Sequence, residues 1–192
     1  MINTYFDHDI HFDYLYPDHI QQLSSVHWTP IDVARKAAEF LCWPGHKVMD
    51  IGCGVGKFCL TSAFFHPGTR FYGIEQRPAL IKFANDTKKH LHLTNVDFLQ
   101  GNITDIDLRE YRSLYFFNSF HENLNTLAGI DSTVNRNFDL YRFYTQLLYR
   151  KLDEQPSGCR LVTYYTEATQ IPPSYKKVEK FYHPELKLYK KN

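Results

Sequence analysis

The stretch KVMDIGCGVG, residues 47–56, decides the fold of this chain. Its first half is a short apolar run that predicts a β-strand, and its second half carries glycine at every other position. Residues 57–65 then continue in a pattern that predicts a helix. A strand that passes through a glycine loop into a helix is a common start of a nucleotide-binding α/β domain.

The elements on either side extend this pattern. Residues 70–75 predict a second strand, and Pro78 opens a helix that runs to about His90. Upstream, Thr29 is expected to cap a helix that begins with Pro30. Further strands are predicted at residues 96–99, 113–118 and 160–165, a helix at 138–152, and a closing antiparallel pair at 178–182 and 186–189. Helices are expected to fill the remaining gaps, which predicts an α/β fold with a mostly parallel sheet, helices on both faces and a C-terminal antiparallel hairpin.

Composition narrows the class of protein. The chain has 192 residues, of which 43% are hydrophobic, so one compact domain is expected. Lys and Arg number 22 against 21 Asp and Glu, which gives no strong nucleic-acid signal. The start of the chain lacks the features of a secretion signal, and no apolar run reaches the length of a membrane span, so a cytoplasmic protein without a membrane partner is expected. The four cysteines have no metal or disulfide spacing, and we expect free thiols and no metal. Nothing in the sequence indicates the oligomeric state.

The glycine loop and Glu75 are expected to meet at one ligand site, because both follow the carboxyl ends of parallel strands. Gly52, Gly54 and Gly56 let the backbone come close to a bound molecule. Glu75, at the tip of the second strand, is placed to accept hydrogen bonds from both hydroxyls of a ribose.

The spacing of the loop argues against two other nucleotide sites. A dinucleotide fingerprint needs its third glycine three residues after the second, whereas Lys57 occupies that position and Gly56 comes one place early. A phosphate-binding P-loop needs Ser or Thr after its lysine, but Phe58 follows Lys57, and Ile51 stands where its first glycine belongs.

The segment DIGCGVG, residues 50–56, resembles motif I of the class I S-adenosylmethionine-dependent methyltransferases, in which an acidic residue precedes a G-x-G-x-G loop. The resemblance covers about residues 27–165. It implies a Rossmann-like, seven-stranded fold, S-adenosylmethionine as the cofactor and S-adenosylhomocysteine as the product.

The same resemblance assigns the cofactor-binding residues. It implies that Asp50 and the loop backbone hold the methionine part, that Glu75 holds the ribose, and that residues 101–103 meet the adenine. Asn102 departs from the Asp that many relatives carry there. The HWTP segment at residues 27–30 resembles one that helps to close over the cofactor in several subfamilies, which adds Thr29 to the site.

Asn118, at the end of the predicted fourth strand, is the candidate for chemistry because the acceptor should lie there, beside the methyl group. It resembles the Asn of the Asn-Pro-Pro-aromatic motif of nitrogen methyltransferases, although Ser119 replaces the first proline and Phe120 arrives one residue early. His121 is a candidate general base and Glu122 a candidate to orient a cationic amine, although residues of these types are more often simply polar loop residues.

Residues 1–26 form an N-terminal extension before the methyltransferase domain at 27–192. The extension is rich in His, Asp and Tyr, but its spacing matches no metal motif, so we interpret it as a lid or part of a substrate wall.

These observations lead to two hypotheses. The first is a methyltransferase whose unidentified acceptor is a protein or small molecule, with a nitrogen of a side chain or small amine favoured. The alternative is a non-catalytic module that binds S-adenosylmethionine as a sensor or partner subunit, because an intact glycine loop fits both.

Overall fold

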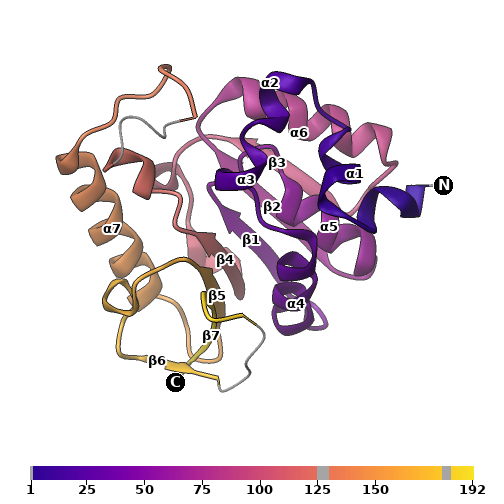
Figure 1. Ribbon diagram of the computed structural model, residues 1–192. Coiled ribbons are helices and arrows are strands. Elements are labelled where there is room, and N and C mark those ends of the chain that lie inside the picture. Colours follow the sequence, from indigo (N-terminus) through magenta and orange to yellow (C-terminus); the bar gives the residue numbers. More distant parts are fainter. Residues whose placement is uncertain (1, 125–129, 179–182) are drawn as a thin grey trace.

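The computed structural model describes residues 2–124, 130–178 and 183–192, and a seven-stranded sheet in the order β3-β2-β1-β4-β5-β7-β6 forms its centre (Figure 1). Strands β1 to β5 run parallel to one another, and β7 runs antiparallel to both β5 and β6. The predicted α/β fold with a mostly parallel sheet is therefore confirmed. The strands span Lys47–Ile51 (β1), Arg70–Glu75 (β2), Val96–Gln100 (β3), Ser113–Phe117 (β4), Arg160–Tyr164 (β5), Tyr175–Lys177 (β6) and Leu186–Lys191 (β7).

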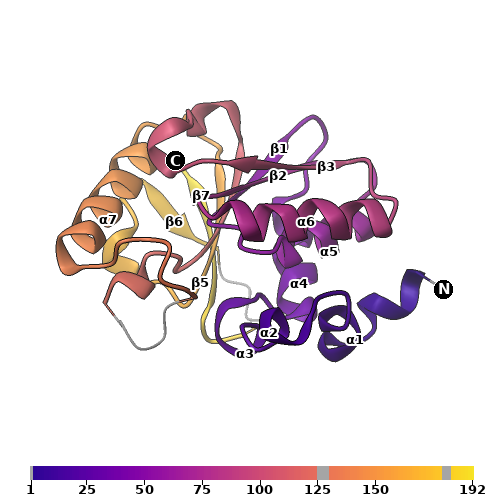
Figure 2. The ribbon, with the colours of Figure 1, turned by 90° about the horizontal axis from the view of Figure 1, so that it is seen from above.

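Helices cover both faces of this sheet. Three of them pack against one face (Figure 2), namely α4 (Ile31–Leu41), α5 (Lys57–Phe65) and α6 (Pro78–His90). The other face packs against α7 (Phe138–Asp153). Successive strand residues point to opposite faces, so Val48 enters the core under α4 and α5 whereas Met49 enters the core under α7.

The connection from β3 to β4 differs from the prediction that helices fill every gap. It holds two short 3-10 turns, η2 (Ile103–Asp105) and η3 (Leu108–Glu110). Asn102 and Asp107 accept hydrogen bonds from the backbone N–H groups of Thr104 and Arg109. Short polar side chains that bind the nearby backbone in this way favour turns over a continuous helix.

The C-terminal hairpin is confirmed, but the prediction placed its first strand too late. β6 begins at Tyr175 rather than at Val178, and its Lys176 lies opposite Lys190 of β7. Val178 still donates a backbone hydrogen bond to Leu188. The rest of the predicted strand, residues 179–182, lies outside the described residues.

The start of α4 also corrects the sequence prediction. Thr29 does not cap this helix, because its hydroxyl instead hydrogen-bonds the Tyr115 hydroxyl at 2.9 Å. Pro30 is the N-cap residue, and the N–H of Ile31 donates to the carboxylate of Asp9 at 3.0 Å. A carboxylate from the N-terminal extension therefore satisfies an orphan donor of the first helical turn.

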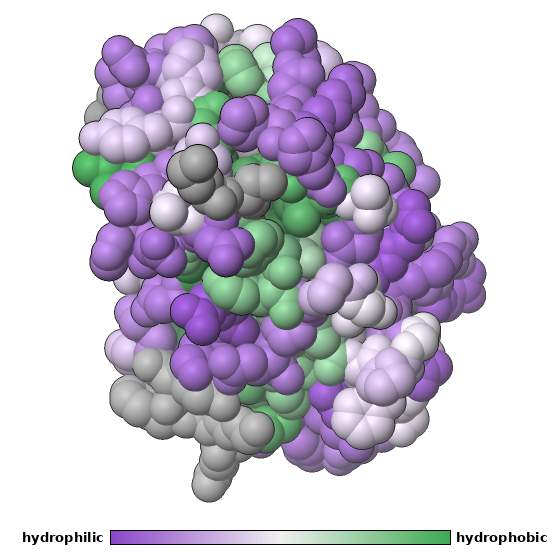
Figure 3. All heavy atoms as spheres, turned by 90° about the vertical axis from the view of Figure 1, so that its right-hand side faces the viewer, coloured by the Kyte–Doolittle hydropathy of each residue, from purple (hydrophilic) through white to green (hydrophobic). Residues whose placement is uncertain are grey.

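The N-terminal extension packs onto the domain through buried aromatic residues. It forms η1 (Ile2–Phe6), α1 (Asp9–Asp13), α2 (Asp18–Gln21) and α3 (Ser24–His27). Phe6 stacks on Phe64 of α5, with ring centroids 4.2 Å apart, and Phe12 is fully buried. Figure 3 shows the face of the molecule that lies on the right-hand side of Figure 1. Apolar residues gather near the centre of this face, and hydrophilic residues surround them.

Three polar contacts hold this extension behind the glycine loop. The Lys57 ammonium, only 3% exposed, lies 2.7 Å from the carboxylate of Asp9 and 2.8 Å from that of Asp13. The Tyr16 hydroxyl donates to the carbonyl of Val55 at 3.1 Å. Within the described part of the chain, no helix has the length and apolarity needed to cross a membrane.

Candidate functional site

A cavity of about 720 Å³ opens at the carboxyl ends of the parallel strands. This is the edge of an open α/β sheet at which ligands bind. The glycine loop, the ends of β2, β4 and β5, and α3 supply its walls. It is lined by every residue that the sequence placed in the site except Gly56, namely Thr29, Asp50, Gly52, Gly54, Glu75, Asn102, Asn118 and His121.

The three loop glycines have positive φ angles, but they make room for different neighbours. A Cβ on Gly52 would lie 2.4 Å from the Ser119 hydroxyl, and one on Gly56 would lie 2.4 Å from the Phe98 ring. A Cβ on Gly54 would meet no atom within 4 Å. Two glycines therefore let the protein's own side chains pack, and Gly54 is the one that leaves space beside the cavity.

Glu75 lines the cavity and is hydrogen-bonded to the glycine loop. Its carboxylate accepts hydrogen bonds from the backbone N–H of Gly54 at 3.3 Å and from that of Arg77 at 3.0 Å. The side chain is buried, and burial raises its pKa, while the bond from Arg77 acts in the opposite direction. The structure thus brings the glycine loop and Glu75 together, as their positions after parallel strands predicted.

Asp50 is buried at the end of β1, where the Cys59 thiol hydrogen-bonds its carboxyl at 3.7 Å. Burial raises the pKa of Asp50 to about 8, and the nearby Glu75 adds to the rise. In an unfolded chain an aspartate has a pKa of about 3.9. The folded protein therefore keeps this carboxyl protonated at neutral pH, whereas the unfolded chain loses the proton.

The shift at Asp50 predicts a pH-dependent effect of Asp50→Asn on the cofactor-free protein. Between about pH 4 and pH 8, the unfolded chain binds fewer protons than the folded protein, so the wild type loses stability as pH rises through this window. Each pH unit changes its free energy of unfolding by up to about 1.4 kcal/mol. Because the side-chain amide of the variant cannot ionise, its melting temperature relative to wild type should rise from pH 5 to pH 8 and then level off.

Thermal unfolding at half-unit pH steps measures this difference, with Asp86→Asn as an exposed control. A constant difference between Asp50→Asn and wild type across the window would contradict the shifted pKa.

Asn102 lines the cavity, but its side chain is engaged within the protein. Its amide nitrogen donates to the Gln76 side-chain oxygen at 3.2 Å and to the Tyr144 hydroxyl at 2.9 Å. Its amide oxygen accepts from the N–H of Thr104 at 3.3 Å. Asn102 therefore fixes the shape of the loop after β3.

Asn118 directly follows β4 and lines the cavity. Its φ angle of 34° lies in the left-handed region, which Asn tolerates better than most residues. Its side-chain amide makes no hydrogen bond with any residue in the described ranges, while its carbonyl accepts from the N–H of His121 at 2.9 Å. His121 opens the short turn η4 (His121–Asn123) and its side chain is exposed.

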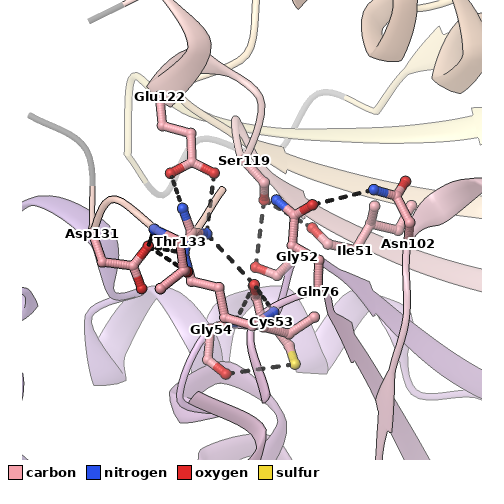
Figure 4. Close-up of polar contacts among 12 residues, drawn as sticks. Ile51, Gly52, Cys53, Gly54, Gln76, Asn102, Ser119, Glu122, Asp131 and Thr133 are labelled. Carbon is pink, nitrogen blue, oxygen red and sulfur yellow. Dashed lines mark hydrogen bonds and ion pairs between the residues drawn. The ribbon is translucent and has the colours of Figure 1, made fainter. Parts of the chain in front are cut away.

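Ser119 connects the segment after β4 to the end of β1 and to the glycine loop. Its hydroxyl donates to the carbonyl of Ile51 at 2.9 Å and lies 3.4 Å from that of Gly52 (Figure 4). The position that holds proline in the Asn-Pro-Pro-aromatic motif thus carries a hydrogen bond from the segment after β4 to the end of β1.

Two further groups at the cavity were not found from the sequence. Arg77 is 2% exposed and contacts the carboxylates of Glu75, Glu122 and Asp131. Phe117 and Tyr165 form an aromatic wall with Tyr164, whose ring centroid lies 4.8 Å and 4.6 Å from theirs. No local pattern marks these residues, because their partners lie on other strands and loops.

Comparison with known proteins agrees with this geometry. A family model described as a methyltransferase domain matches residues 44–185. The tRNA (guanine-N(7)-)-methyltransferase of Synechocystis is 46% identical over 55 residues, which cover 29% of this chain and 26% of that protein. The same-named protein of Nostoc is 35% identical over 86 residues, covering 44% of this chain and 38% of that protein. These matches span well under half of the curated relatives.

Solved structures share the fold at low sequence identity. An RNA methyltransferase from Salinibacter ruber, in complex with S-adenosyl-L-homocysteine, has a TM-score of 0.57 at 20% identity and covers 84% of this chain and 90% of that one. TrmN from Thermus thermophilus has a TM-score of 0.63 at 15% identity, covering 90% of this chain and 52% of that one. With the family model spanning most of the sequence, the chain belongs to the class I S-adenosylmethionine-dependent methyltransferases.

Proposed function

We propose that this chain transfers the methyl group of S-adenosylmethionine to a nitrogen of RNA. The observation that carries the proposal is that one cavity is lined by the Gly54–Glu75 pair and by Asn118, whose side-chain amide makes no hydrogen bond with a described residue. Its volume of about 720 Å³ falls within the usual range for small-molecule sites.

The residues present fit the cofactor. Glu75 keeps lone pairs for ribose hydroxyls, Gly54 leaves room beside the loop, and Thr29 lines the same cavity from the α3 side. Asp50 and the glycine loop would hold the methionine part, and the backbone at Asn102 would meet the adenine. The bound cofactor supplies a methyl group already activated by its sulfonium.

The chain's own contribution is therefore alignment and exclusion of water. The amide oxygen of Asn118 would accept a hydrogen bond from the acceptor and aim its nitrogen at the methyl carbon. Where the acceptor nitrogen carries a proton, His121, three residues further on, would remove it; a ring nitrogen without a proton, such as N7 of guanine, would need no base. Trp28 and α3 would cover the cavity, which extends the lid prediction to this segment.

The acceptor proposal departs from the protein or small amine that the sequence favoured. Two of the relatives compared above are named as tRNA methyltransferases and act, by name, on a guanine nitrogen. The aromatic wall of Phe117, Tyr164 and Tyr165 supports a flat ring as acceptor, because bases stack on aromatic side chains.

A cationic row supports the same class of acceptor, although the net charge is near zero. Lys176 of β6 lies opposite Lys190 of β7, which in turn lies opposite Arg160 of β5. Like charges in directly opposed positions destabilise a sheet, and none of the three forms an ion pair with a described residue. The Arg160 guanidinium also lies 4.3 Å from the ring centroid of Trp43, which is 51% exposed. Phosphates of an RNA backbone would offset this repulsion.

The proposed function is tested by incubating the protein with radiolabelled S-adenosylmethionine and separate RNA, protein and small-molecule fractions of a cell extract. We expect label in RNA, recovered after digestion as a nucleoside methylated on nitrogen. Label in protein or in small amines would overturn the RNA acceptor.

The cationic row gives a second prediction. Lys176→Glu combined with Lys190→Glu should weaken RNA binding and lower the slope of log K against log salt by about 2 if both lysines contact phosphate. Lys82→Glu with Lys89→Glu, on exposed positions of α6, makes the same charge change elsewhere. Filter binding over a salt series measures both, and equal slopes for the two double variants would exclude the row from the RNA interface.

A further inference from the structure

Arg77 is a buried cation that lines the cavity. It follows β2 by two residues, it is the N-cap residue of α6, and its side chain is 2% exposed. Three carboxylates surround it, from segments separated in sequence. Glu75 belongs to β2, Glu122 to η4 after β4, and Asp131 to the segment before α7.

The strongest of these contacts is the one to η4. The two terminal nitrogens of Arg77 donate to the two oxygens of Glu122 at 3.1 and 2.7 Å (Figure 4). This bidentate geometry fixes direction as well as distance. Both oxygens of Glu122 are thereby engaged, so it holds its loop in place instead of facing a cationic amine.

The other contacts of the guanidinium point to the cofactor side and to the neighbouring segment. Nε donates to Asp131 at 3.1 Å, and the same Asp131 oxygen accepts from the hydroxyl of Thr133 at 2.7 Å. One terminal nitrogen lies 3.5 Å from the Glu75 oxygen that accepts the Arg77 backbone N–H. Glu75 is the carboxylate proposed for the ribose.

The network carries more negative than positive charge. Three carboxylates share one guanidinium, so Glu75 and Glu122 repel each other, and Arg77 offsets this repulsion. A ligand whose hydroxyls donate to Glu75 also lowers this repulsion and lets Arg77 hold Glu122 more firmly. Glu122 lies in the loop that begins at Asn118, so its contact with Arg77 anchors the loop that carries the Asn118 amide.

We infer that Arg77 is a positioning residue which couples occupancy of the cofactor site to ordering of the Asn118–Leu124 loop, so that the acceptor side is completed once the cofactor is bound. This inference rests on the proposed placement of the ribose at Glu75. It does not depend on which acceptor is used.

Amide hydrogen exchange with and without S-adenosylhomocysteine tests the coupling without any acceptor. In the wild type, the ligand should slow exchange both in the glycine loop and in residues 117–124. In Arg77→Lys, which keeps the charge but lacks the planar fork, slowing should persist at residues 52–56 and fall by at least half at 117–124. Glu122→Gln should behave in the same way, and it keeps the Arg77–Asp131 contact if the first variant folds poorly.

Arg109→Lys is the matched control, since Arg109 makes an exposed ion pair with Asp107 at 2.7 Å and lies outside the cavity. A purely structural role for Arg77 would speed exchange in both states and leave the ligand-dependent difference intact. That result, or a wild type whose 117–124 segment ignores the ligand, would overturn the inference. Failure of RNA methylation with the exchange pattern intact would instead reject the acceptor alone.

Discussion

Glu75→Ala is expected to weaken S-adenosylmethionine binding by on the order of 1.5–3 kcal/mol, or roughly ten- to a hundredfold in Kd. The ribose hydroxyls would lose their charge-assisted hydrogen bonds to the buried Glu75 carboxylate. The substitution also removes the acceptor for the Gly54 N–H, so the loop that faces the cavity would lose an anchor. Isothermal titration calorimetry measures the change directly.

Glu75→Gln separates the two effects of that substitution. An amide oxygen can still accept from Gly54 or Arg77, but it lacks the negative charge, so an intermediate affinity is expected. Asp86→Ala, on the exposed face of α6, controls for the loss of a carboxylate elsewhere on the protein. An unchanged affinity of Glu75→Ala would remove Glu75 from the cofactor site.

Asn118→Ala is expected to lower kcat by about 100-fold, because a shift of about 1 Å in the aligned nucleophile carries a cost of that order. The affinity for S-adenosylmethionine should stay within roughly threefold of wild type, since the Asn118 amide makes no hydrogen bond to the described residues of the cofactor side. Single-turnover transfer measures the chemical step and calorimetry the binding.

Two companions sharpen the Asn118 prediction. Asn118→Asp keeps the shape and an acceptor oxygen, and should retain more activity than Asn118→Ala toward an acceptor that donates an N–H. If His121 is the base, kcat of the wild type should depend on pH, and His121→Ala should both lower kcat and remove that dependence. A large loss of cofactor affinity in Asn118→Ala, with turnover preserved, would place the acceptor elsewhere.

The sequence predicted the features that depend on local pattern. An apolar run followed by alternating glycines fixes β1, its loop and the start of α5, and Glu75 follows from the length of the next strand. Parallel strands place those segments at one edge whatever the side chains around them do. The approach of Glu75 to Gly54 is a consequence of the sheet topology, and the sequence pattern predicted that topology.

The sequence did not predict which side chains of distant segments contact one another. Local pattern assigned Thr29 a capping role, because Thr before Pro is common at helix starts, but a hydroxyl of β4 lies within its reach and Asp9 serves the helix instead. Asn102 resembled a ligand contact, yet three partners within the protein engage its amide. Arg77 carried no signal, since its three carboxylates are spread from residue 75 to residue 131.

The burial of Lys57 between Asp9 and Asp13 has a practical consequence for handling this protein. A version shortened to begin at residue 27 would remove both carboxylates from Lys57 and would expose the apolar surface that Phe6 and Phe12 cover behind the glycine loop. Such a version should precipitate or purify without cofactor affinity. Affinity tags and fusion partners are therefore best kept away from these first helices, which pack behind the glycine loop.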